Sequence, residues 1–296
     1  GLEVVGNNAQ VSLKHMKKPL ILTMSAPSQD LFKAQLDKVL SYADLRGERV
    51  NEVLAQVVPQ STHWSAVAGL SPERHRYTWE LLSVGLRFAM VIVMQFKFKL
   101  NCPRPVAYSA LVQPMILTPG YSALPSGHAT EATFAAELLS ALDHVGRHRK
   151  VEHFPLDPKD GLDPNHYPKE CRLPKESHLR HQLHRLAHRI SENRVVAGLH
   201  FPIDSIAGQV LGIVLARYFL WRCASEWHYP TSWGFKPQDD GVLHKQVEPV
   251  LDCPLDPLLG PSKLPIEVGK LVSESAPDGA PATVLPALWA SACKEW

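Results

Sequence analysis

Apolar residues at helical spacing dominate this chain, and this pattern limits the folds open to it. We expect helices over Ser28–Leu45, from Ser71 to about Leu100, from Ser126, from about Ser177, and from Ile203 to about Trp227. The alternation typical of half-buried strands is nearly absent. Because 296 residues can bury a large core, we predict an all-α helical bundle.

Proline-rich stretches divide the chain between and after these helices. Residues 143–177 hold five prolines, many charges and no apolar period, which indicates an inserted loop or lid. Beyond Tyr229 the chain is again rich in proline with little periodicity. We therefore predict a single domain over 1–296, with a helical core over about 28–229, an insertion over about 143–177 and an irregular wrapping tail over 230–296.

Composition narrows the class of protein. An apolar share of 45% and a charged share of 20% are typical of a soluble globular chain. The net charge of +2 argues against a nucleic-acid binder. Arginines interrupt both of the most apolar helices, so we expect no integral membrane span. The five cysteines are scattered without metal-type pairing, which favours reduced thiols and the cytoplasm over the periplasm.

Three clusters of polar residues fall at the ends of the predicted helices. They comprise Lys97 with Arg104-Pro105, then Pro125-Ser126-Gly127-His128, then Arg194 with His200 and Asp204. A helix start offers free backbone N–H groups, arginine forks match tetrahedral oxyanions, and lysine adds a point charge. Together they predict a pocket for a phosphate-like anion that needs no metal ion to neutralise charge.

The same clusters contain the groups that phosphoryl transfer needs. One histidine can attack phosphorus while the other protonates the leaving oxygen. Asp204, four residues after His200, can accept a hydrogen bond from the far ring nitrogen and so orient the imidazole.

In this order and spacing, the motifs resemble the three-part signature of the type 2 phosphatidic acid phosphatase superfamily, over roughly residues 71–217. That superfamily includes bacterial acid phosphatases, membrane lipid phosphatases and vanadium-dependent haloperoxidases. The resemblance implies its helical fold, with His200 as the nucleophile or vanadium ligand, His128 as the acid–base and Asp204 as the partner of His200. It assigns oxyanion binding to Lys97, Arg104, Ser126, Gly127 and Arg194.

The resemblance leaves the reaction open. A phosphatase acting on small phosphate monoesters through phosphohistidine is favoured, and it needs no cofactor. The alternative is a haloperoxidase that uses vanadate on His200, with peroxide and halide as substrates; Tyr121 then stands where that branch tunes halide selectivity. A non-catalytic phosphate-binding protein is a third reading, and a homo-oligomer stays open. Asn193 stands where the superfamily usually has serine.

The histidines at 178, 181, 184 and 188 invite a zinc site. On a helix, His181, His184 and His188 fall opposite the apolar stripe, with no carboxylate or cysteine nearby in the segment. We therefore expect a solvated basic face there.

Overall fold

The computed structural model describes residues 2–15, 20–57, 60–148, 178–224, 233–235, 237, 266–268 and 284–296. Its main helices are α1 (Gln29–Ser41), α2 (Arg46–Ala55), α3 (Ser61–Ala68), α4 (Arg76–Leu100), α5 (Gly127–His148), α6 (His178–Val196), α7 (Pro202–Cys223) and α9 (Val284–Ala292). Short 3-10 turns occupy Tyr42–Leu45, Pro105–Ala107 and Ala110–Val112. The fold is mainly helical, as predicted.

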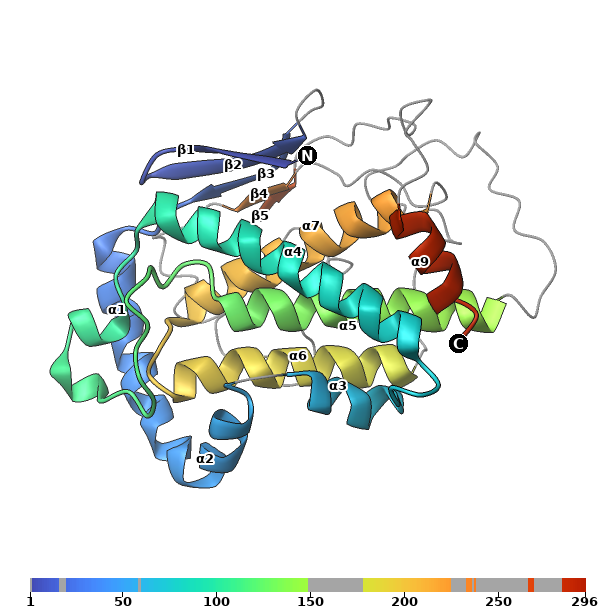
Figure 1. Cartoon of the computed structure of the whole chain (residues 1–296). Coiled ribbons are helices and arrows are strands. Elements are labelled where there is room, and N and C mark those ends of the chain that lie inside the picture. Colours follow the sequence, from blue (N-terminus) through green and yellow to red (C-terminus); the bar gives the residue numbers. More distant parts are fainter. Residues whose placement is uncertain are drawn as a thin grey trace.

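Helix α5 lies at the centre of the molecule and contacts α4, α6 and α7 (Figure 1). Nearly every side chain from Ala129 to His144 is buried, so α5 is apolar or small on most of its circumference. Helix α7 is similarly buried along its length. These two helices form the core against which the others pack, and both begin at a predicted motif.

Two glycines on α7 allow the α5–α7 contact to be close. A Cβ on Gly208 would lie 2.5 Å from the Ser126 backbone oxygen, and one on Gly212 would lie 2.6 Å from the Thr130 oxygen. These atoms belong to the backbone and cannot move aside as a flexible side chain would. The absence of a side chain at both positions therefore sets the separation of the two helix starts.

A sheet at the N-terminus corrects the all-α prediction. Strands β1 (Leu2–Gly6), β2 (Gln10–His15) and β3 (Leu20–Ser25) pair antiparallel, β4 (Trp233–Phe235) adds parallel to β3, and β5 (Ile266–Val268) pairs antiparallel with β4. Val11 and Leu13 point into the core between more exposed neighbours. This alternation was present in the sequence, but it is too short to stand out against long helical periods.

Several helix boundaries also differ from the prediction. The first helix is α1 followed by a 3-10 turn, and two unpredicted helices, α2 and α3, follow it. Helix α4 begins at Arg76 rather than at Ser71, because Ser71 closes a turn in which its N–H donates to His75 Nδ1 at 3.1 Å. Helix α5 continues through Asp143 to His148; the rest of the predicted insertion, 149–177, lies outside the described residues.

The predicted tail is not irregular at its end. Helix α9 packs against α4 and α7, near one end of α5 in Figure 1. After it, the Glu295 carboxylate accepts hydrogen bonds from the backbone N–H groups of Tyr77 and Thr78, both at 2.9 Å. A carboxylate at a helix N-terminus satisfies free donors and complements the helix dipole. The last residues of the chain thus cap the first turn of α4.

The expected solvated histidine face on α6 is wrong for His184. Its side chain is buried against α5, with Nε2 3.3 Å from Glu137 Oε1. The carboxylate comes from a different helix, so the sequence of α6 alone could not reveal it. Within the described ranges, no group of three or more His, Cys, Asp or Glu side chains is arranged to hold a metal ion.

Two segments are long and apolar enough to cross a membrane by length and composition. They are Arg76–Ala107, whose most apolar window is 44% buried, and Pro202–Cys223, whose window is 89% buried. Core helices of soluble proteins pass the same test, and α7 is largely buried inside the fold. Several apolar side chains of α4 are exposed, among them Met90, Val91 and Phe98. The expectation of a soluble protein stays a prediction.

Gly208→Ala is expected to lower the free energy of unfolding by about 1–3 kcal/mol, because the new methyl group meets backbone rather than a movable side chain. Gly47→Ala in α2 is the matched control, since a Cβ there has no atom within 4 Å. The control should be neutral or more stable by up to about 1 kcal/mol. Urea unfolding measures both, and equal losses in the two variants would contradict the packing argument.

Candidate functional site

All three predicted motifs converge where α4 and α6 end and α5 and α7 begin. Lys97 lies in the last turn of α4, Arg104 in the loop after it, Arg194 near the end of α6, and His200 just before α7. Ser126 immediately precedes α5, and Gly127 and His128 form its first turn. Hydrogen bonds and electrostatic interactions connect the motifs to one another.

Lys97 points from α4 towards the loop before α5. The helix ends because Asn101 adopts the left-handed conformation, with φ of 43°. Lys97 Nζ donates to the backbone oxygens of Ser122 and Ala123 at 2.8 and 2.9 Å. Burial, reinforced by the nearby Arg104 charge, lowers the pKa of Lys97 to about 7. An added anion would favour its charged form.

Arg104 connects the loop before α5 to the loop before α7. Its guanidinium donates to the backbone oxygens of Tyr121 at 3.1 Å, Ser122 at 3.3 Å and Leu199 at 3.0 Å. One nitrogen, Nη1, also lies 3.1 Å from His200 Nε2. The exposed Tyr121 ring lies beneath both cations, with its centroid 5.4 Å from Lys97 Nζ and 5.4 Å from Arg104 Cζ. Tyrosine at this position therefore stabilises positive charge.

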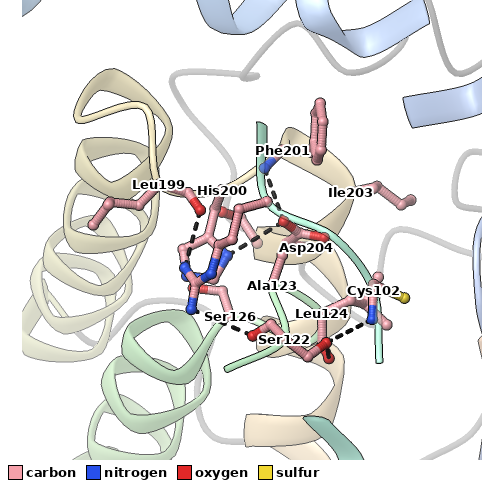
Figure 2. A network of polar contacts seen from close by, with 12 residues as sticks. Cys102, Ser122, Ala123, Leu124, Ser126, Leu199, His200, Phe201, Ile203 and Asp204 are labelled. Atoms are coloured by element: carbon pink, nitrogen blue, oxygen red, sulfur yellow. Dashed lines mark hydrogen bonds and ion pairs between the residues drawn. The ribbon is translucent and has the colours of Figure 1, made fainter. Parts of the chain in front are cut away.

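His200 has a defined tautomer in this arrangement. A guanidinium can only donate, so Nε2 must accept from Arg104 and the ring proton must lie on Nδ1. Nδ1 then donates to Asp204 Oδ2, 3.3 Å away (Figure 2). Burial and the surrounding cations hold the pKa of His200 well below its usual range. The imidazole is thus neutral, with its Nε2 lone pair among the cations.

Asp204 orients more than the imidazole. Its Oδ2 also accepts from the Phe201 backbone N–H at 2.8 Å, which fixes the carboxylate at the start of α7 (Figure 2). Its backbone oxygen accepts from the Ser126 N–H at 2.9 Å, which joins the starts of α5 and α7. The carboxylate is fully buried, and burial raises the pKa of Asp204 to about 7. The cations and the Phe201 N–H oppose this rise and favour the carboxylate.

The start of α5 is a capped helix N-terminus with open space beside its first turn. Ser126 is fully buried, and its Oγ accepts from the Ala129 N–H at 3.4 Å, as a helix cap does. The next residue, Gly127, leaves space above the first turn, since a Cβ there would meet only atoms at 3.8 Å and beyond. The carboxyl of Glu131 borders this space, and burial raises its pKa to about 7.

Arg194 and His128 approach from the side of α2. Arg194 is fully buried and donates through Nη2 to the Val53 oxygen at 3.0 Å. Its Nε and Nη1 are buried and have no hydrogen-bond partner within the described residues. The Nε2 of His128 lies 3.1 Å from the Gln56 backbone oxygen and therefore carries the ring proton. Burial and the Arg194 charge lower the pKa of His128 to about 4.

Helix α2 contributes residues that the sequence interpretation missed. Arg49 forms an ion pair with Glu192 of α6, and Glu52 binds Arg189 through two hydrogen bonds of 2.7 and 2.8 Å. Gln56 follows at the end of α2. The spacing of these polar residues along one helical face was the available signal, but it carries meaning only once α2 is recognised as a helix.

The comparisons with protein families and with curated proteins assign no family to this chain. No protein-family model matches it, and no curated protein matches it at a significant level. The roles of the site residues therefore stay predictions, for which the geometry above provides the physical argument.

The low pKa of His128 predicts an acid-side loss of stability. An unfolded histidine titrates near 6.5, so between pH 6.5 and 4 the unfolded chain binds a proton that the folded chain does not. The free energy of unfolding should therefore fall as the pH drops through this window. From pH 7 to pH 5, the free energy of unfolding of the wild type should fall by about 2 kcal/mol more than that of His128→Gln, which lacks the titrating imidazole.

Urea unfolding in a buffer without phosphate measures this difference. His181→Gln, at an exposed position of α6, is the control and should follow the wild type at both pH values. Parallel pH dependences for His128→Gln and the wild type would show that His128 titrates normally.

Proposed function

We propose that this protein is a metal-independent phosphatase of the type 2 phosphatidic acid phosphatase kind, which hydrolyses phosphate monoesters through a phosphohistidine on His200. The observation that carries the proposal is a neutral histidine, oriented by a buried carboxylate, whose lone pair lies among buried cations. This is the form of imidazole that can act as a nucleophile.

In the proposed reaction, Arg104 transfers its hydrogen bond from His200 Nε2 to an oxygen of the bound phosphate. The freed Nε2 lone pair then attacks phosphorus, and the bond to the leaving oxygen breaks. His128 donates a proton to that oxygen, and in the second half-reaction it accepts one from the water that hydrolyses the phosphohistidine. A bound dianion raises the pKa of His128, so the imidazolium needed as the acid forms only with substrate present. Lys97, Arg104 and Arg194 balance the charge on the transferred group.

Vanadium-dependent haloperoxidase activity is the second candidate. The unpartnered nitrogens of Arg194 and the lone pair of His200 suit vanadate as well as phosphate. When bound, vanadate would activate peroxide for halide oxidation. The position of Tyr121 beside two cations supports this candidate, because positive charge there would attract a halide ion approaching from that side.

One titration separates the candidates. Metal-free protein receives orthovanadate stepwise while p-nitrophenyl phosphate hydrolysis and peroxide-dependent bromination are followed together. A phosphatase loses hydrolysis as vanadate binds and never brominates, which is the outcome we expect. Bromination that rises with bound vanadium would instead establish the haloperoxidase. If neither reaction occurs but phosphate still binds, the protein is a non-catalytic binder.

His200→Ala tests the nucleophile in the same assays. Removing it should lower kcat at least about 10³-fold, because the remaining groups only bind and orient the substrate. His181→Ala is the control and should keep wild-type turnover. Hydrolysis that survives in His200→Ala would exclude the phosphohistidine route.

A further inference from the structure

Gln56 contacts two of the predicted site residues at once. Its backbone oxygen accepts from His128 Nε2 at 3.1 Å, and its side-chain Oε1 accepts from Arg194 Nη2 at 3.3 Å. The residue is 2% exposed and lies at the C-terminal end of α2, more than one hundred residues away in sequence from Arg194. None of the three motifs includes it.

The Gln56 side chain is itself held in place. Asn193 Nδ2 donates to Gln56 Oε1 and to Glu52 Oε2, both at 2.9 Å, and Asn193 Oδ1 accepts from Arg49 at 3.2 Å. Asn193 is fully buried. An amide here can bridge two acceptors on α2 through one nitrogen, which a serine hydroxyl with its single proton cannot do. The residue that differs from the superfamily pattern is thus the one that fixes Gln56.

Helix α2 also determines which nitrogens of Arg194 are available. Gln56 Oε1 and the Val53 oxygen both accept from Nη2, which leaves Nε and Nη1 without partners in the described part of the chain. The Nε–H and the two N–H groups of Nη1 lie on different edges of the guanidinium, and each remains able to donate a hydrogen bond to an oxyanion. Because the acceptors are neutral, they orient Arg194 without offsetting its charge.

We propose that Gln56 is a positioning residue that holds the acid–base His128 and the oxyanion-binding Arg194 in a fixed relation. This inference rests on the proposed function. Gln56 does not touch the reacting atoms; it acts through the two residues that do.

Gln56→Met tests the side-chain contact, because methionine matches the length of glutamine but lacks the amide. The inhibition constant for inorganic phosphate and the KM for p-nitrophenyl phosphate should both rise about tenfold, the usual effect of removing a supporting hydrogen bond. The kcat should change less, since the backbone oxygen that contacts His128 remains. Gln60→Met is the matched control: Gln60 is also buried, at 8% exposure, and its Oε1 has no partner within the described residues.

Gln56→Glu keeps a hydrogen-bond acceptor at position 56 and changes only its charge. This second variant tests the inference if Gln56→Met does not fold. A carboxylate accepts the same hydrogen bonds but offsets the charge of Arg194, so phosphate should bind several-fold more weakly at pH 7. The new charge also lies near the Glu52 carboxylate, so a modest loss of thermal stability is expected. Constants within twofold of the wild type in folded Gln56 variants, or equal changes in Gln60→Met, would overturn the inference. A wild-type protein that neither hydrolyses the ester nor binds phosphate overturns the proposed function itself, and this inference with it.

Discussion

Three cationic side chains, Lys97, Arg104 and Arg194, lie 2%, 7% and 0% exposed, and their hydrogen bonds are made largely to backbone oxygens. Neutral acceptors hold these groups in position but do not repay the loss of hydration that burial of charge entails. Burial and the neighbouring positive charges lower the pKa values of Lys97, His128 and His200. A bound oxyanion would oppose all three shifts, so binding of an anion here would be coupled to protonation of these groups.

The starts of α5 and α7 have to stay in register for this site to exist. Asp204 connects the two helix starts. Its carboxylate accepts hydrogen bonds from His200 and from the Phe201 N–H, while its backbone oxygen accepts one from the Ser126 N–H. Glycine at 208 brings the helices close enough for that last bond. The close packing of α7 on α5 in the core therefore also determines the geometry of the candidate site.

Sequence patterns predicted the mainly helical fold, because long apolar periods are strong signals, and they selected side chains that the fold brings together. They missed the N-terminal sheet, whose alternation around Val11 and Leu13 is short. They also missed the burial of His184, which depends on Glu137 from another helix, and the role of Gln56, which depends on α2. Each miss involves partners distant in sequence or elements too short for a periodic signal. The sequence does not distinguish the two candidate reactions, because the same side chains would bind phosphate and vanadate.

The backbone hydrogen bond between Ser126 and Asp204 also restricts where insertions and deletions can occur in this chain. One residue added or lost within an α-helix turns everything beyond it by about 100°. Such a change between Asp204 and Gly212 would replace a glycine with a side chain at the contact, and one between Ser126 and Thr130 would move the facing backbone oxygens. Natural versions of this chain should therefore keep a constant length across 126–130 and 204–212, and collect their insertions and deletions elsewhere.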